Sequence, residues 1–293
     1  MKMRSQCARI QVSFRYTIGM ERFIIGCGYL GQYVAREWLA RGYSVAGLTR
    51  ARADVLSAAG VTPILGDVLE PAQWVQQIRP RVIVYAVGWD RNSGYSFRDL
   101  HLNGVRRVLE SCPSPEKFIY ISSTSVHGQT DGSWIDETSA TEPLEENGKS
   151  ILEAEQAVRA YVPSSIILRF AGIYGPTRMI RQSAIIAGQP LLLDPEKCIN
   201  LIHVEDGARA VLAAEDLAQP GSTFLVADGH PVARGDFYRH MAQLLGAPEV
   251  RFQPVPSSGA DHANRKISNR KLLSELNLRL RYPDYRSGLT ASL

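Results

Sequence analysis

One segment near the start of the chain constrains the fold more than any other: a short apolar run that ends in a glycine-rich turn. Residues 22–25 (Arg-Phe-Ile-Ile) have the apolar character of a buried strand, and Gly26, Gly28 and Gly31 follow directly. Beyond the turn, apolar side chains recur at the spacing of a helix. They are Leu30, Val34, Trp38 and Leu39. A strand, a tight glycine turn and a helix in this order open a βαβ unit.

The same alternation continues through the first half of the chain. Short apolar runs predict further strands at 43–48, 62–65, 81–86, 117–122 and 166–170. Amphipathic stretches predict helices at 53–59, 71–78 and 101–111. Repeated βα units with apolar strands predict an α/β fold, namely a doubly wound parallel sheet of the Rossmann type with helices on both faces.

The composition is that of a folded protein with a large core, because 45% of the 293 residues are hydrophobic and 21% are charged. No stretch approaches the roughly 18 apolar residues that a membrane-spanning helix needs, so we predict a cytoplasmic protein without a membrane partner. The cysteines lie far apart, without metal-ligand spacing, which predicts reduced thiols and no metal site. They are Cys7, Cys27, Cys112 and Cys198.

The net charge of +4 arises at the start of the chain, because residues 1–20 contain four bases and no acid. The remaining chain carries 29 bases against 29 acids. A nucleic-acid partner would require a basic surface, and the count predicts none. We interpret residues 1–20 as a disordered extension, either inert or upstream of a translation start at Met20. An organelle-targeting segment is the alternative.

Each glycine of the turn has a role if the turn binds the phosphates of a dinucleotide. The first allows the tight turn, the second lets a pyrophosphate approach the backbone, and the third lets helix and strand pack closely. The free N–H groups and partial positive charge at the helix start then attract the phosphates. Residues 26–31 therefore predict a dinucleotide site that includes Tyr29 and Leu30. A glycine turn without a ligand is the alternative.

The end of the second predicted strand indicates which dinucleotide is bound. An acid there hydrogen-bonds the ribose 2′-hydroxyl of NAD, whereas arginine suits the additional phosphate of NADP. The chain has Arg50 and Arg52 at this place, and no carboxylate before Asp54. We therefore predict NADP, with NAD as the alternative. Two solvated arginines on an exposed loop would give the same pattern.

Several further motifs of the chain occur together in one known family. Residues 66–68 (Gly-Asp-Val), 86–88 (Ala-Val-Gly) and 121–128 (Ile-Ser-Ser-Thr-Ser-Val-His-Gly) follow the third, fourth and fifth predicted strands. The segments LRFAGIYGP at 168–176 and IHVEDGARA at 202–210 come later. With these motifs the chain from residue 21 onward resembles the extended short-chain dehydrogenase/reductase family, also called the NAD-dependent epimerase/dehydratase family. Its atypical members with a G-x-G-Y-L-G loop are the most similar.

The resemblance implies further residues of the cofactor site. Asp67 would meet the adenine amino group, and Val68 would pack on the adenine. Residues 86–88 would line the path of the adenosine and pyrophosphate, and the asparagine of the following helix also matches the family pattern. These additional predicted cofactor residues are Ala86, Val87, Gly88 and Asn103.

The chemistry of the family rests on a Tyr-x-x-x-Lys pair and a nearby Ser or Thr hydroxyl, and here only the hydroxyl is found. The lysine lowers the tyrosine pKa and orients the nicotinamide ribose, while the tyrosine exchanges a proton. Ser123 matches the hydroxyl, but Asn147 and Ile151 stand at the tyrosine and lysine positions. A register shifted by two residues would place Glu145 and Lys149 there, and matches fewer neighbouring residues.

Two nearby residues are candidates to replace the missing acid–base group. Glu146 lies at the start of the same predicted helix, where a carboxylate is also favoured simply by the helix dipole. His127 could titrate near neutral pH and act as an acid, and a structural role is the alternative. The predicted catalytic residues are therefore Ser123, His127 and Glu146.

The second half of the chain is less regular and predicts a smaller substrate-binding cap. We expect residues 21–175 to form the NAD(P)-binding Rossmann domain and 176–293 mainly the cap, with strands near 199–229 returning to the sheet. Substrate would lie between the cap and the carboxyl edge of the sheet. Possible lining residues, for which surface or core roles are equally plausible, are Arg169, Tyr174, Arg178, Arg181, His203 and Arg265.

Two functions are consistent with these observations. The first is an atypical NAD(P)-dependent oxidoreductase or epimerase, a monomer or homodimer that acts on a nucleotide sugar or another polar metabolite. The second is a catalytically silent NAD(P)-binding sensor or regulator, because Asn147 and Ile151 cannot perform the usual proton transfer.

Overall fold

The computed structural model describes residues 21–90, 93–112, 115–253 and 262–293. Residues 1–20, for which we predict a disordered extension, lie outside these ranges. In the described ranges no helix is both long and apolar enough to cross a membrane.

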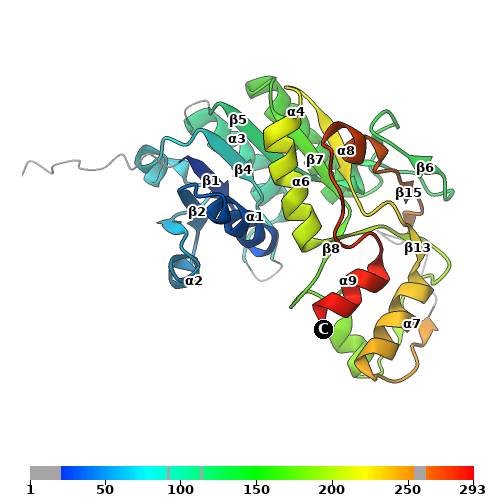
Figure 1. Ribbon diagram of the computed structural model, residues 1–293. Helices are drawn as coiled ribbons and strands as arrows, with labels where there is room; N and C mark the ends of the chain where they lie inside the picture. Colours follow the sequence, from blue (N-terminus) through cyan, green and yellow to red (C-terminus); the bar gives the residue numbers. More distant parts are fainter. Residues whose placement is uncertain (1–20, 91–92, 113–114, 254–261) are drawn as a thin grey trace, which may run out of the picture.

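A parallel sheet of seven strands forms the centre of the molecule (Figure 1). Its strand order is β12-β7-β5-β4-β1-β2-β3, so the chain starts in the middle, runs to one edge and then crosses back to build the other. This confirms the predicted doubly wound α/β fold. Ligands of such sheets bind at the carboxyl edge where the order reverses, here beside β1 and β4. The strands are β1 (Arg22–Ile25), β2 (Val45–Thr49), β3 (Thr62–Leu65), β4 (Val82–Tyr85), β5 (Lys117–Ser123), β7 (Ile166–Phe170) and β12 (Thr223–Val226).

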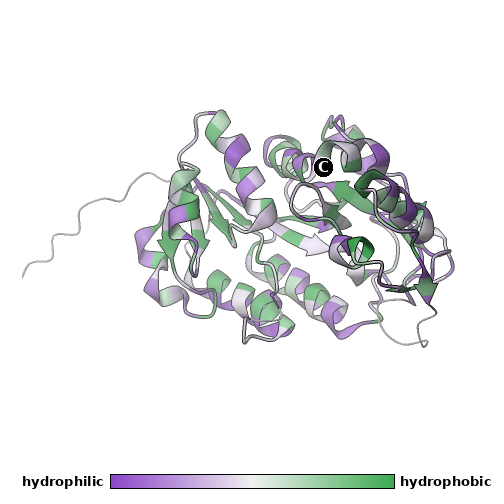
Figure 2. Cartoon of the chain, turned by 90° about the horizontal axis from the view of Figure 1, so that it is seen from below, coloured by the Kyte–Doolittle hydropathy of each residue, from purple (hydrophilic) through white to green (hydrophobic). Residues whose placement is uncertain are grey.

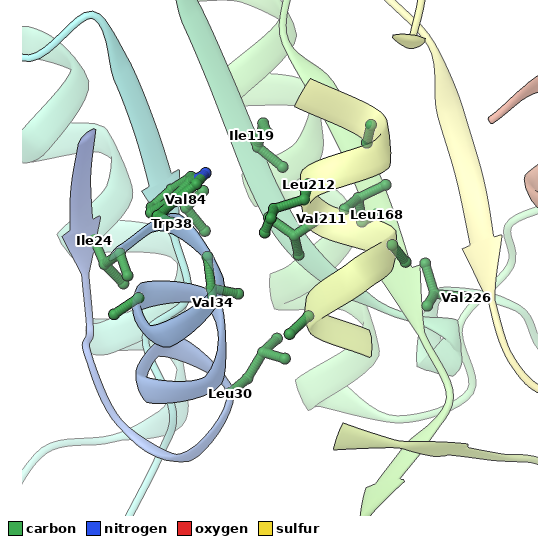
Figure 3. Packing of buried hydrophobic residues seen from close by; sticks show 14 of the residues in the cluster. Ile24, Leu30, Val34, Trp38, Val84, Ile119, Leu168, Val211, Leu212 and Val226 are labelled. Atoms are coloured by element: carbon green, nitrogen blue, oxygen red, sulfur yellow. The ribbon is translucent and has the colours of Figure 1, made fainter. Parts of the chain in front are cut away.

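Alternate residues of the strands point to opposite faces, and each face carries its own hydrophobic core. On one face α1 (Tyr29–Ala40) and α6 (Val204–Leu217) pack side by side over the strands. Figure 3 shows Val34 and Trp38 of α1 and Val211 of α6 in this layer. The shorter helices α2 (Ala53–Ala58) and α8 (Arg270–Glu275) contribute buried leucines to the same layer.

The opposite face is covered by α3 (Gly104–Ser111) and α4 (Glu146–Tyr161). A π-helical turn, Asp99–Asn103, precedes α3. The helix predicted at 71–78 is replaced by two 3₁₀ turns, Pro71–Gln73 and Val75–Gln77, separated by the fully buried Trp74. This helix prediction was wrong.

One buried carboxylate joins the first strand, the first helix and α6. Glu215 of α6 forms an ion pair with Arg22 of β1, with 2.7 Å between Nε and Oε1. Its second oxygen accepts a hydrogen bond of 2.6 Å from the indole N–H of Trp38. Since a buried charge is tolerated only when it is paired and hydrogen-bonded, the three elements depend on one another.

A smaller region lies beyond the carboxyl edge of the sheet and has a third core, with α7 (Arg234–Leu245) and α9 (Tyr285–Ser292) among its helices (Figure 1). In Figure 2 the strands of the central sheet are mainly hydrophobic, whereas the helices carry both hydrophobic and hydrophilic residues. The segment carrying α8 belongs to the sheet instead, because Leu272 packs in the core under α1 and α6. The other elements beyond the sheet are β6 (Trp134–Ile135), β8 (Gly172–Tyr174), α5 (Gln182–Ile186), β9 (Leu191–Leu192), β10 (Cys198–Ile199), β11 (Leu201–His203), β13 (Val232–Ala233), β14 (Phe252–Gln253) and β15 (Lys266–Ile267).

Candidate functional site

A cleft of about 450 Å³ opens at the carboxyl ends of β1, β2 and β4, where the strand order reverses. It brings together predicted cofactor residues from four separate segments of the sequence. Those that line it are Gly26, Gly28, Tyr29, Arg50, Arg52, Asp67, Val68, Val87 and Gly88. Several further residues of the lining were not predicted from the sequence. They are Cys27, Leu48, Thr49, Ala51, Gly66, Trp89, Asp90 and Leu100.

The first glycine of the turn is required by the backbone itself. Gly26 has φ of +87°, a conformation that L side chains rarely adopt. A Cβ atom at this position would lie 2.6 Å from the Cα atom of Val87. The turn therefore passes directly against the chain that leaves β4.

The second glycine faces open space at the start of α1. A Cβ atom on Gly28 would meet nothing closer than the carbonyl oxygen of Gly26, 4.0 Å away, among the described atoms. No described side chain caps α1, and its first turn contains no acid. The N–H groups and partial positive charge of the helix start are thus left for an anion, and the residues present fit a pyrophosphate.

The third glycine and its neighbour lie behind the cleft. A Cβ atom on Gly31 would be 3.0 Å from the carbonyl oxygen of Gly26 and 3.0 Å from Ile24. Leu30 is buried in the core between α1 and α6, and the Ala86 N–H donates to the Ile25 carbonyl. These three predicted residues shape the cleft without lining it.

Tyr29 connects the glycine turn to a distant loop. Its hydroxyl donates a 2.9 Å hydrogen bond to the carbonyl oxygen of Pro176, and the Arg178 guanidinium lies 5.4 Å from the centre of its ring. Burial raises the pKa of Tyr29, so the hydroxyl remains a neutral donor. We predicted Arg178 only as a possible substrate residue, and its place beside the helix start could not be read from the sequence.

The other end of the cleft combines charges suited to an adenosine phosphate. The exposed Arg50 guanidinium lies 5.5 Å from the centre of the Tyr95 ring. The negative charge of the Asp67 carboxylate raises the pKa of Tyr95. Val68 packs against Gly104, whereas the Asn103 amide donates to Asp99 at 3.0 Å and lies outside the cleft lining.

Ser123 ends β5 and is half-buried. Its Oγ accepts a 3.1 Å hydrogen bond from the backbone N–H of Ser125. Among the described residues its own hydroxyl hydrogen has no acceptor, so it is available to a ligand. The start of α4 is adjacent, because a Cβ atom on Gly148 would lie 2.5 Å from the carbonyl oxygen of Ser125.

The helix start contains no substitute for the missing pair that points inward. Asn147 is exposed and Ile151 is only 2% exposed. The side chain of Glu146 is 85% exposed and bonds Lys149 at 2.6 Å. Glu146 is thus an exposed charge at the helix start, the alternative to a catalytic role, and we assign it no step of the reaction. The close packing at Gly148 supports the register with Asn147 at the tyrosine position.

His127 belongs to a buried network of charged and polar side chains. Nδ1 lies 3.1 Å from the Ala140 carbonyl oxygen, so it carries the hydrogen, and Nε2 accepts from Arg169 at 3.3 Å. Burial, together with the charge of Arg169, lowers the pKa of His127 to about 4. Both ring nitrogens are occupied and the ring is neutral, which supports the structural role over the catalytic one.

Arg169, which we considered a substrate residue, is paired with a carboxylate instead. Its Nε and Nη2 bond the two oxygens of Glu155 at 2.9 and 2.7 Å, and the side chains are 10% and 6% exposed. The Ser122 hydroxyl donates to the same carboxylate. This network fixes β5, β7 and α4 relative to one another behind Ser123.

The other possible substrate residues have diverse environments. The Tyr174 ring is buried against α9, and the His203 ring lies 4.0 Å from the Tyr282 ring. Arg181 is exposed and has φ of +61°, whereas Arg265 is 9% exposed.

The chain matches a known family and several known proteins in sequence. The model of the NAD dependent epimerase/dehydratase family matches residues 23–227. Protein YeeZ of Escherichia coli is 28% identical over 279 residues, covering 89% of this chain and 96% of that protein. A 2-alkyl-3-oxoalkanoate reductase of Shewanella oneidensis is 28% identical over 269 residues, covering 80% and 68%.

A solved structure shows the same fold at lower sequence similarity. It is a UDP-glucuronic acid 4-epimerase of Bacillus cereus in complex with UDP-glucuronic acid and NAD. Its TM-score is 0.79 at 18% identity, with 93% of this chain and 98% of that chain covered. With the family model matching most of the sheet and its glycine turn, the chain belongs to the NAD-dependent epimerase/dehydratase family.

Proposed function

We propose that the protein binds NADP(H) in the cleft beside the glycine turn and acts slowly on a polar carbonyl or sugar substrate. The observation that carries the proposal is the cleft itself, which joins an uncapped helix start, Asp67 and Arg50 in one continuous lining. The helix start suits the pyrophosphate, and Arg50 suits a 2′-phosphate. Bound NADPH would supply a hydride.

Arg50→Ala tests the choice of cofactor. We expect the wild-type protein to bind NADPH more tightly than NADH, and the variant to lose about tenfold of its NADPH affinity, because a charge-assisted hydrogen bond is removed. Isothermal titration calorimetry gives both affinities. NADH is the internal control, because it lacks the 2′-phosphate and should bind the variant as it binds the wild type. Equal wild-type affinities for the two cofactors would contradict the proposed NADP preference.

The protein's own contribution to the chemistry is a hydrogen bond from Ser123. Because its Oγ accepts from the Ser125 N–H, the hydroxyl hydrogen can polarise a substrate oxygen at the carboxyl end of β5. Substrate would then lie between this strand end and the region around α7 and α9. A nucleotide sugar is one candidate, since the UDP-glucuronic acid 4-epimerase shares the fold. A carbonyl compound is another, since a related sequence is a 2-alkyl-3-oxoalkanoate reductase.

If the protein is an enzyme, its turnover should be slow, because Asn147 has no proton to exchange near neutral pH and Ile151 provides no charge. Loss of positioned acid–base catalysis lowers rates by roughly a hundred- to ten-thousandfold. We expect a panel of sugar nucleotides and carbonyl compounds, followed at the NADPH absorbance band, to show at most residual oxidation. Ser123→Ala should abolish this residual NADPH oxidation, and Ser125→Ala should leave its rate unchanged. Rapid turnover that survives Ser123→Ala would place the active site elsewhere.

The replaced pair also favours a second function, that of a cofactor-binding sensor. Ile151 lies within the core at 2% exposure, and a lysine at this position would have to leave it. Clear NADPH binding with no turnover across the panel would support the sensor and reject the slow enzyme.

A further inference from the structure

A second cavity lies on the outer side of the ribbon that β6 and β15 form. Its volume of about 460 Å³ falls within the range of about 300–1,000 Å³ that small-molecule sites occupy. Within the described ranges it shares no lining residue with the cofactor cleft, and β5 and β7 lie between β12 and β4 in the sheet. Figure 1 shows β6 and β15 far from β1 and β2. The cavity is therefore separate from the cofactor cleft.

The alternation of the two strands turns an indole toward this cavity. Ile135 and Ile267 point inward and pack in a small core beside β12. Because neighbouring residues of a strand point to opposite faces, Trp134, Asp136 and Ser268 point outward, and all three line the cavity. Trp134 is 57% exposed. A large apolar face is thus left in water, and a ligand that covers it gains free energy.

The same alternation separates the cavity from the region proposed for the substrate. Arg265 lies two residues before Ile267 and points inward, because its Nη2 donates to the carbonyl oxygen of Thr124 at 2.8 Å. Thr124 directly follows Ser123 at the carboxyl end of β5. Ser268 is directed to the opposite side of the ribbon, so a ligand in the cavity would not contact Ser123.

The lining carries one anionic and one cationic side chain. The Asp136 carboxylate accepts hydrogen bonds from the hydroxyl and the backbone N–H of Thr138 at 2.6 and 2.9 Å. These bonds lower the pKa of Asp136, so it stays an anion with acceptor sites to spare. The exposed Arg270 guanidinium forms no ion pair with any described residue. Because Asp136 repels a phosphate and Arg270 repels an ammonium group, the lining favours a neutral ligand that both donates and accepts hydrogen bonds.

One wall of the cavity is fixed by close packing. The buried Asn269 amide donates a 2.9 Å hydrogen bond to the carbonyl oxygen of Ala227. Gly229 has φ of +78°, and a Cβ atom on it would lie 2.5 Å from Oδ1 of Asn269. This wall is formed before a ligand arrives, which reduces the ordering cost of binding.

We infer that the cavity binds the pyranose ring of a hexose. One face of such a ring carries C–H groups that stack on an indole, and its rim carries hydroxyls that donate and accept hydrogen bonds. Trp134 takes the C–H face, Asp136 accepts from the hydroxyls and Arg270 donates to them. The ring belongs either to a free hexose or to the terminal unit of an oligosaccharide. The inference goes beyond the proposed function and does not rest on it.

Nuclear magnetic resonance of the full chain with ¹⁵N-labelled tryptophan tests the inference, because the four tryptophans give separate indole N–H signals. Trp134→Phe assigns the signal of Trp134. D-glucose, D-galactose, D-mannose, maltose and cellobiose are then added in turn. We expect a saturating shift of the Trp134 signal with at least one sugar and none for the fully buried Trp38 and Trp74. Tighter saturation by a disaccharide than by glucose would identify an oligosaccharide as the source. No saturating shift with any of these sugars would overturn the inference.

Two further compounds test the chemistry of the ligand. D-sorbitol has the hydroxyls of glucose on an open chain, so it should not shift the Trp134 signal. L-leucine is a zwitterion with an apolar side chain, and its two charges match Asp136 and Arg270. Saturation by L-leucine and by no sugar would overturn the inference in favour of an amino-acid site. A shift with sorbitol equal to that with glucose would contradict stacking of the ring.

Variants of the lining connect the signal to binding. Calorimetry with the sugar that saturates should show an affinity lower by about tenfold or more in Trp134→Ala, because the stacking surface is removed. Asp136→Asn should cause a loss of about tenfold, because a charged acceptor becomes neutral. Tyr161→Ala is the matched control, since this aromatic side chain of α4 is 50% exposed and lies outside the cavity lining. Unchanged sugar affinity in Trp134→Ala would show that the cavity is not the binding site.

NADPH separates failure of this inference from failure of the proposed function. Trp89 lines the cofactor cleft, so NADPH should shift its indole signal, assigned with Trp89→Phe, and leave the Trp134 signal in place. A sugar shift at Trp134 without an NADPH shift at Trp89 would reject the proposed function alone. An NADPH shift at Trp89 without any sugar shift at Trp134 would reject the hexose site alone.

Discussion

Gly28→Val is expected to lower NADPH affinity by about a hundredfold or more while the protein remains folded. The new side chain would enter the open space at the start of α1, where a Cβ atom has no neighbour closer than 4.0 Å. It would thereby hold the pyrophosphate away from the backbone N–H groups. Losing two charge-assisted hydrogen bonds of about 1.5–3 kcal/mol each accounts for the size of the effect. Fluorescence titration measures the affinity, and circular dichroism measures thermal unfolding.

Gly26→Ala is the matched control two residues earlier. Here φ is +87° and a Cβ atom would lie 2.6 Å from Val87, so the variant should lose stability. The two glycines thus differ in kind: one is required by the fold and the other by the ligand. An unchanged NADPH affinity in folded Gly28→Val would remove the glycine turn from the cofactor site.

Glu155→Gln should lower the free energy of unfolding by about 3–5 kcal/mol, because it leaves the buried Arg169 charge without a partner. The amide keeps the size of the carboxylate, so the change is one of charge and hydrogen bonding rather than of packing. Urea denaturation followed by circular dichroism measures the loss.

The same helix provides a control with similar geometry and different burial. Glu153 bonds Arg98 at 2.9 and 2.7 Å, as Glu155 bonds Arg169, but these side chains are 39% and 50% exposed. Water screens such exposed pairs. The free energy of unfolding of Glu153→Gln should therefore equal that of the wild type within the uncertainty of the denaturation curve. If both variants lost equal stability, burial would not be the reason for the strength of the inner pair.

The sheet could be predicted from the sequence because its signals are local. The apolar run at 62–65 and the one at 166–170 coincide with β3 and β7. The helix predicted at 71–78 fails for a tertiary reason. Trp74 turns into the core with φ of −126°, and its indole N–H donates to the carbonyl oxygen of Asp67, which interrupts the helix.

The candidate site was predictable only where a motif marks it. Glycines and arginines close to strand ends identified the cleft, since their spacing reflects the backbone turn. Arg169 and Arg265 looked alike in the sequence, as cations near a possible substrate. Their difference arises from residues distant in the chain, because Glu155 neutralises the first and Asn200, 65 residues before Arg265, fixes the second.

The carboxylate of Glu215 has a consequence for the order in which the chain can fold during synthesis. Trp38 leaves the ribosome 177 residues before the glutamate that accepts its indole hydrogen bond, and Arg22 leaves earlier still. Until α6 emerges, the first strand and helix expose an apolar surface and a cation without its counterion. The amino-terminal half therefore cannot complete its core until α6 has been synthesised. A ribosome that stalled before α6 would carry a chain suited to capture by chaperones.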